Sequence, residues 1–293
     1  MILSIGEILA DLIGEEENGI MKYDCFCGGA PFNVAVNAKQ SGAKVGFIGR
    51  VGKDPVGKFV ADYAEKAGLD FLNVQKDEER NTTLAIVSLT NGERDFSFFR
   101  RDTADFHIDG KEIDLNNYDD LNIVHLGSLM LSEEKGQKFA RATLKKIRKA
   151  NKIFSFDVNF RMDLYKNFND AVKAYKYFID EADILKFSDD EILCYTGEKD
   201  IKKAMKRLYK KDRLLLVTLG SNGSAYAYNE LSGEIPTEKV KPVDTTGAGD
   251  AFYGTALANL DGKNFTKENI ENALISGNQA GARATLVKGA IRL

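Results

Sequence analysis

Residues 243–252 read Val243-Asp244-Thr245-Thr246-Gly247-Ala248-Gly249-Asp250-Ala251-Phe252 and lead into an apolar, helix-compatible run that continues to Leu260. Gly247 and Gly249 allow backbone N–H groups to approach an anion closely, at a helix N-terminus whose dipole favours negative charge. We expect Asp250 in the first helical turn, where its carboxylate accepts a proton from a hydroxyl group while the amides stabilise a transferring phosphoryl group. A shorter Gly-x-Gly-Asp pattern would be explained as well by helix capping, but ten residues in this order are more specific. The stretch therefore predicts a phosphate site with a general base beside it.

Short apolar runs, each followed by helix-compatible spacing, recur along the rest of the chain. The expected strands are residues 2–5, 45–48, 123–126, 153–156, 184–187 and 214–218, and the expected helices are residues 31–41, 56–67, 133–150, 169–181 and 201–210. Continuous apolar residues, instead of alternating ones, predict strands that are covered on both faces. Alternation of strand and helix predicts a mainly parallel sheet between layers of helices. We expect an α/β fold in a single domain over residues 1–293.

Two β-rich segments interrupt this alternation. Residues 83–90 and 93–100 flank Asn91-Gly92, which supplies the positive φ angles of a type I′ turn, so the sequence predicts a β-hairpin. Together with strands from residues 14–26, this hairpin is expected to form a small lid, built from about residues 12–26 and 80–105, apart from the main sheet. A second antiparallel pair is expected at residues 225–229 and 233–236, at the edge of the sheet.

Composition limits the function classes. The 293 residues are 43% hydrophobic and 29% charged, and 41 Lys and Arg balance 44 Asp and Glu to a net charge of −3. A balanced charge provides no field for a polyanion, so we expect no nucleic-acid partner. No apolar run approaches the roughly 20 residues of a membrane helix, and Glu7 stands where a secretory signal needs a basic start. We expect a cytoplasmic protein without a membrane partner.

Two common nucleotide-binding motifs are excluded. Gly52-Lys-Asp-Pro-Val-Gly57-Lys58-Phe59 resembles the start of a P-loop, but Phe59 replaces the Ser or Thr that binds magnesium. We also do not expect this segment to connect a strand with its helix. A Rossmann Gly-x-Gly-x-x-Gly is absent after the first strand, because Gly6 is followed by Glu7-Ile8-Leu9-Ala10-Asp11. The sequence therefore disfavours a P-loop enzyme and a dehydrogenase.

Residues 244–252 resemble the C-terminal signature of the ribokinase-like sugar kinases, also called the PfkB carbohydrate kinase family. Gly28-Gly29-Ala30-Pro31-Phe32-Asn33-Val34-Ala35 resembles the N-terminal signature of that family, and Gly49-x-x-Gly52-x-Asp54-x-x-Gly57 follows at the usual distance. The resemblance covers essentially the whole chain. It implies a ribokinase-like, three-layer α/β/α fold with a mainly parallel central sheet and a small β-rich lid.

The resemblance also implies roles for individual residues. Asp250 matches the catalytic base, and Gly247, Ala248 and Gly249 match the anion hole. The sugar-contacting positions of the family are matched by Asp11, Gly29 and Asn33. Asp157-Val158-Asn159-Phe160-Arg161, after the strand at 153–156, resembles an element of fructokinase-like and 2-keto-3-deoxygluconate kinase-like members. It places Asn159 and Arg161 at the substrate, where Arg161 holds a phosphate or a sugar-acid carboxylate unless it forms a surface salt bridge.

Further matches concern the nucleotide and metal ions. Lys186-Phe-Ser188-Asp-Asp-Glu191 stands at the family's Asn-x-x-Glu motif, with Ser188 in place of Asn, and implies that Glu191 acts on Mg²⁺ through water. The residues that match nucleotide-binding positions are Lys186, Thr218, Gly220, Gly223 and Asn278. Asp244 and Thr246 are expected to border a site for a monovalent cation such as K⁺. The implied cosubstrate is ATP.

The lid is expected to select the sugar. Phe98-Phe99-Arg100-Arg101-Asp102-Thr103-Ala104-Asp105 resembles an element of fructokinases, in which Phe98 offers an apolar face and Arg100 a hydrogen-bond donor. The expected reaction is transfer of the γ-phosphoryl group of ATP to a primary hydroxyl of fructose, giving fructose 6-phosphate. Two alternatives stay open: Arg100 and Arg161 clamp the carboxylate of 2-keto-3-deoxygluconate, or the protein binds sugar and nucleotide without catalysis. Exposed lid strands also predict a homodimer through the lid.

Overall fold

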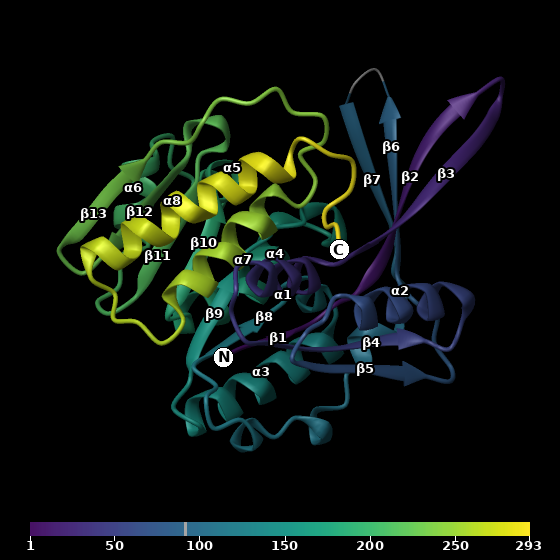
Figure 1. Cartoon of the computed structure of the whole chain (residues 1–293), viewed down its shortest axis with the longest axis horizontal. Helices are drawn as coiled ribbons and strands as arrows, with labels where there is room; N and C mark the ends of the chain where they lie inside the picture. The colour runs from purple at the N-terminus through teal and green to yellow at the C-terminus, as the bar shows by residue number, and fades with distance from the viewer. Residues whose placement is uncertain (91–92) are drawn as a thin grey trace.

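A nine-stranded sheet runs through the middle of the computed structural model, which describes residues 1–90 and 93–293 (Figure 1). Its strand order is β13-β12-β11-β10-β9-β8-β1-β4-β5. The strands are β1 (Ile2–Ile5), β4 (Val45–Gly52), β5 (Phe71–Asp77), β8 (Ile123–Leu126), β9 (Ile153–Asp157), β10 (Ile184–Ser188), β11 (Leu214–Thr218), β12 (Ser224–Tyr228) and β13 (Leu231–Ile235). In this order, neighbouring strands from β11 through β1 to β5 pair in parallel. Strands β12 and β13 add an antiparallel edge, as the sequence predicts.

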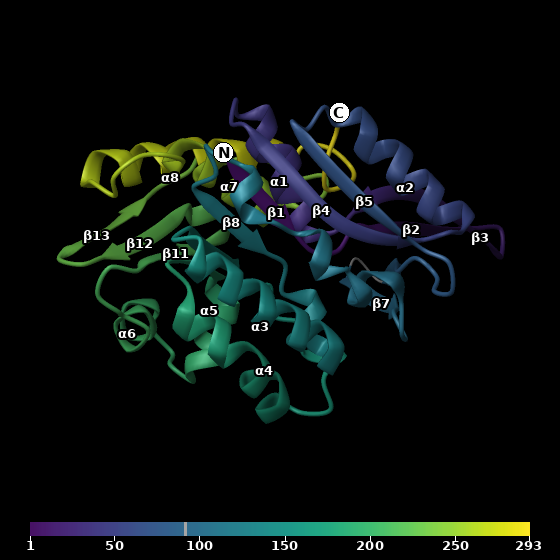
Figure 2. The ribbon, with the colours of Figure 1, turned by 90° about the horizontal axis from the view of Figure 1, so that it is seen from below.

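Helices cover both faces of the sheet (Figure 2). One layer contains α3 (Glu134–Lys149), α4 (Phe168–Glu181), α5 (Asp189–Thr196) and α6 (Ile201–Arg207), and the other contains α1 (Ala30–Gln40), α2 (Pro55–Lys66), α7 (Ala248–Leu260) and α8 (Lys267–Ala284). The predicted three-layer α/β/α fold is thus confirmed. In the described part of the chain, none of the helices is long and apolar enough to cross a membrane.

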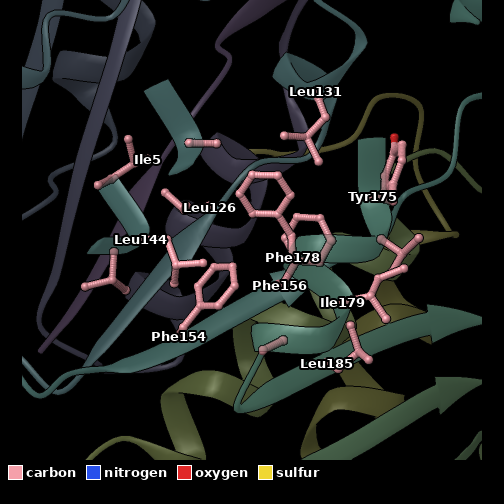
Figure 3. Packing of buried hydrophobic residues seen from close by; sticks show 14 of the residues in the cluster. Ile5, Leu126, Leu131, Leu144, Phe154, Phe156, Tyr175, Phe178, Ile179 and Leu185 are labelled. Atoms are coloured by element: carbon pink, nitrogen blue, oxygen red, sulfur yellow. The ribbon is translucent and has the colours of Figure 1, made fainter. Parts of the chain in front are cut away.

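Each face of the sheet has its own apolar core. On β1, Leu3 and Ile5 pack into the core beneath α3 and α4, where Phe154, Phe156 and Phe178 meet (Figure 3). Ile2 points the other way, into the core beneath α1, α7 and α8. Both faces of such a strand are buried, which is why its sequence is continuously apolar instead of alternating.

Four strands form a second sheet that projects from the body of the molecule (Figure 1). They are β2 (Leu9–Glu17), β3 (Ile20–Gly28), β6 (Leu84–Thr90) and β7 (Glu93–Phe99), in the order β3-β2-β6-β7. Each hairpin is antiparallel, and β2 joins the two hairpins by pairing in parallel with β6. We call these four strands the lid. The predicted Asn91-Gly92 turn lies outside the described residues.

The expectation that the segment around Gly52 does not connect a strand with its helix is wrong. Gly52 ends β4, and Asp54 is the N-cap of α2, where its side chain accepts a hydrogen bond from the Gly57 amide at 2.7 Å. The segment around Gly52 therefore does connect a strand with a helix, because Asp54 and Pro55 start the helix directly after the strand. The P-loop remains excluded by Phe59 alone.

Candidate active site

Two neighbouring cavities lie where the carboxyl ends of the parallel strands face the N-terminus of α7. The first has a volume of about 320 Å³ and lies beneath the lid, and its lining includes Glu7, Asp11, Gly29, Asn33, Phe98, Asn159, Arg161, Lys186, Glu191, Gly247, Gly249 and Asp250. The second has a volume of about 300 Å³, and its lining includes Thr218, Gly220, Gly223, Ala248 and Asn278. We call them the lid cavity and the outer cavity. Both are lined by Thr245 and Gly249, so they meet at the N-terminus of α7.

The turn before α7 is held by a buried carboxylate. Asp244 accepts hydrogen bonds from the Thr246 amide at 2.7 Å and from the Gly289 amide at 3.0 Å. Gly247 is the N-cap, with φ 76°, and a β-carbon there would lie 2.6 Å from the β-carbon of Ala290. This position therefore requires glycine for both its conformation and its packing. The Ala248 amide donates to the Thr245 carbonyl at 3.3 Å, and the amides beside it at the start of α7 have no carbonyl one turn earlier in the helix, which is the arrangement of an anion hole.

Asp250 lies in the first turn of α7 and lines the lid cavity. Its Oδ2 atom accepts a hydrogen bond of 2.8 Å from Nδ2 of Asn33, which lies on α1. Burial raises the pKa of the Asp250 carboxyl, while the bond from Asn33 and the positive charges of Lys186 and Arg161 lower it. A carboxylate so placed can remove a proton from a substrate hydroxyl in the lid cavity.

The hydrogen bond from Asn33 to Asp250 leads us to predict a change in the pH dependence of kcat when Asn33 is replaced. Asn33→Ala removes a donor that favours the ionised form of Asp250, so the pKa of Asp250 should rise. Because the base acts when ionised, the acidic limb of the pH profile of kcat should move to higher pH. The profile is measured with both substrates saturating. Asn37→Ala, one turn later on α1 and outside the lid cavity, is the matched control and should leave the limb in place.

Glu7 is a cavity residue that sequence reasoning missed. It follows β1, its carboxyl group is buried, and its Oε2 atom has no hydrogen-bond partner among the residues that the structure describes. Burial raises its pKa to about 7, although the charge of Arg100 opposes this. Its backbone also explains Gly29, because a β-carbon at Gly29, where φ is 109°, would lie 2.5 Å from the Glu7 carbonyl oxygen. The position of Glu7 at the carboxyl end of a central strand was the available signal.

Lys186 reaches the anion hole from the lid cavity and not from the outer one. It stands beside Asp157 in the register of β10 and β9, and its Nζ lies 2.8 and 3.0 Å from the two carboxylate oxygens of Asp157. Burial alone would lower the Lys186 pKa, but Asp157 and Glu191 raise it above its usual value. A β-carbon on Gly249 would lie 3.1 Å from this ammonium group. A protonated lysine thus faces the point where the two cavities meet.

Glu191 is tethered by backbone amides. Its Oε1 atom accepts from Phe160 N and its Oε2 atom from Ser188 N, both at 2.8 Å, while Ser188 caps the same helix. Among the described residues, no group of three or more acidic, His or Cys side chains is arranged to hold a metal ion. A carboxylate with this donor set fits a metal ion that is held through water and through the phosphates of a nucleotide, as expected for Glu191.

The structure does not place Arg100 in the lid cavity. Its guanidinium is buried and bound to Asp105, to the Leu129 carbonyl and to Ser132. The structure therefore corrects the expectation that Arg100 contacts the substrate. Arg161 does line the cavity, and in the described part of the chain it forms no ion pair. Phe98 and Asn159 line it as well, the latter with φ 38°.

The chain matches one family along its whole length. Residues 1–293 match the model of the pfkB family carbohydrate kinases. The chain belongs to this family. Among curated relatives, it is 35% identical to a probable fructokinase-5 of Arabidopsis thaliana, over 99% of this chain and 93% of that protein. It is also 34% identical to a putative sugar kinase of Pyrococcus horikoshii, over 89% and 82% of the two chains.

Solved structures show the same fold. A fructokinase of Xylella fastidiosa with bound ATP superposes with a TM-score of 0.89 at 29% identity, covering 99% of this chain and 93% of that one. A fructokinase of Vibrio cholerae with fructose, ADP and calcium bound superposes with a TM-score of 0.87 at 29% identity, covering 99% and 94%. An aminoimidazole riboside kinase of Salmonella enterica reaches 0.84 at 25% identity, over 99% and 94%. The protein is a carbohydrate kinase of the pfkB family.

Proposed function

We propose that this kinase transfers the γ-phosphoryl group of ATP to a primary hydroxyl of fructose, giving fructose 6-phosphate and ADP. One observation carries the proposal: the lid cavity and the outer cavity meet at Thr245 and Gly249, with Asp250 on the lid side of the junction. An acceptor hydroxyl in the lid cavity and a nucleotide in the outer cavity would therefore face each other across the anion hole.

The chemistry follows from the residues at the junction. Asp250 takes the proton of the substrate hydroxyl while the hydroxyl oxygen forms a bond to the γ-phosphorus of ATP. The bond from that phosphorus to the oxygen that bridges it to the β-phosphate breaks, which releases ADP. The amides of residues 247–249 and the ammonium of Lys186 stabilise the charge on the transferring group. Mg²⁺, when bound with the nucleotide, supplies further positive charge at the phosphates, and Glu191 would hold it through water.

The carboxyl groups of the lid cavity favour a neutral sugar over an acidic one. Glu7, Asp11 and Asp250 present three carboxyl groups, whereas Lys186 is already paired with Asp157. With Arg100 bound elsewhere, Arg161 is the cation left for a sugar-acid carboxylate among the described residues of the lining, which supports 2-keto-3-deoxygluconate as the second candidate. The names of the fructokinase relatives support fructose.

The deciding experiment is ADP release with Mg-ATP and a panel of fructose, 2-keto-3-deoxygluconate, glucose, ribose and adenosine, with Asp250→Ala as the blank. We expect fructose to have the highest kcat/KM, by at least about tenfold. Preference for the sugar acid would contradict the proposed substrate and assign Arg161 to the carboxylate. If no member of the panel stimulated ADP release while ATP still bound, the non-catalytic binding protein would replace the kinase proposal.

We also propose a K⁺ site beside Asp244 and Thr246, a homodimer through the lid, a single kinase domain over residues 1–293 and a cytoplasmic location. A fructokinase of Vibrio cholerae has been solved with potassium bound, which supports the K⁺ site.

Apolar side chains exposed on the lid support the homodimer; they are Ile20, Met21, Tyr23 and Phe99. Light scattering of the wild type and of a Met21→Glu/Tyr23→Glu variant tests the dimer.

A further inference from the structure

The two ends of the hairpin β6–β7 meet at one buried carboxylate, that of Asp105. Thr83, directly before β6, donates a hydrogen bond of 2.7 Å to Asp105 Oδ1, and so does Thr103. Arg100, directly after β7, donates to Asp105 Oδ2 from Nε at 3.0 Å and also from Nη2. The side chains of Arg100 and Asp105 are only 2% and 1% exposed, so this ion pair is removed from solvent.

Arg100 also reaches the body of the molecule. Its Nη1 atom donates to the Leu129 carbonyl and to the Ser132 hydroxyl, both at 2.8 Å, and its guanidinium carbon lies 3.7 Å from the centre of the Phe106 ring. Every nitrogen of the guanidinium is thus bound within the protein. A planar fork with this many partners fixes geometry in a way that a flexible ammonium group does not.

The elements that Arg100 joins form one wall of the lid cavity. Phe98 lies on β7 two residues before Arg100 and lines the lid cavity. Leu129, whose carbonyl receives the Arg100 bond, lines the same cavity and packs in a small apolar cluster with Phe98. The other members of that cluster are Leu9, Ala85 and Leu164, of which Leu9 and Ala85 also line the cavity.

We propose that the buried Arg100–Asp105 pair is a positioning device that holds Phe98 and Leu129 in place as the apolar wall of the sugar site, and so sets sugar affinity without touching the sugar. The inference rests on the proposed kinase function and holds for whichever panel sugar is the best acceptor.

The test is steady-state kinetics of Asp105→Asn, which keeps the shape of the side chain and removes its charge. We expect the KM for the sugar to rise at least about tenfold, because a displacement of Phe98 and Leu129 alters the shape of the small sugar site. The KM for ATP should stay within about threefold. Thr83→Val removes one bond to the same carboxylate and should raise the sugar KM by about threefold, which keeps the test valid if Asp105→Asn folds poorly.

Two controls separate positioning from general stability. Asp183→Asn weakens another aspartate–arginine pair, with Arg148, at the amino end of β10, and should lower thermal stability while both KM values stay unchanged. Phe98→Ala should raise the sugar KM, and adding Asp105→Asn to it should raise KM by less than the product of the two single effects. If Asp105→Asn and Thr83→Val only lower the melting temperature, or if the double variant is multiplicative, the proposal is overturned. A wild-type protein that phosphorylates no sugar would instead overturn the proposed function.

Discussion

Asp250→Ala is expected to lower turnover with sugar and ATP at least about a hundredfold, because general-base catalysis contributes 10²–10⁴-fold to such reactions. Asp250 lies on the lid-cavity side of the junction between the two cavities. The substitution removes a carboxylate whose burial is costly, so folding should not suffer. Stopped or coupled assays of ADP release, with thermal unfolding measured on the same preparation, check both parts.

Asp250→Asn is the matched variant, because it keeps the shape of the side chain and cannot accept a proton. It should bind the sugar and ATP with affinities close to those of the wild type, since the loss lies in the chemical step. Near-normal kcat in either variant would show that another group activates the hydroxyl. A loss confined to the sugar KM would show that Asp250 binds the sugar but does not act as a base.

Lys186→Met is expected to reduce both stability and turnover. Lys186 and Asp157 form a buried pair, so removing the lysine leaves a buried carboxylate without a partner, at a cost of about 3–5 kcal/mol in the free energy of unfolding. The same ammonium faces Gly249 at the anion hole, and loss of such a group lowers kcat by about 10²–10³-fold. Urea unfolding and ADP release measure the two effects separately.

The double variant Lys186→Met/Asp157→Asn distinguishes these roles. Neutralising Asp157 removes the uncompensated charge, so most of the lost stability should return. Turnover should stay low, because the cation near the transferring phosphoryl group is still absent. Recovery of turnover together with stability would show that Lys186 serves only to balance Asp157.

Local pattern was enough to predict the layers of the fold and the residues at which its central strands begin. The apolar runs at β1, β8 and β9 signal burial on both faces, and each run is short enough to be a strand. The glycines before Asp250 indicate the anion hole, because Gly247 adopts a positive φ angle that favours glycine over other residues. Such features depend on residues that are close in sequence.

Roles that depend on distant partners were not predictable. Arg100 follows an aromatic strand and looks like a sugar ligand, but its partners Leu129 and Ser132 lie about 30 residues further along the chain. Lys186 sits in a motif associated with nucleotide, yet its register with Asp157 on β9 turns it toward the lid cavity. Glu7 was missed because nothing near it in sequence marks a buried carboxyl in the cavity.

The lid and the helix α7 belong to separate structural units, which has a consequence for how such kinases diverge. Phe98 comes from the four-stranded sheet of the lid, whereas Asp250 and the anion hole come from the helical layer that covers the nine-stranded sheet. Substitutions in the lid can therefore alter which hydroxyl compound is accepted without disturbing the apparatus that transfers the phosphoryl group. New acceptor preferences can arise in this fold through substitutions in the lid, while selection preserves Asp250 and the anion hole.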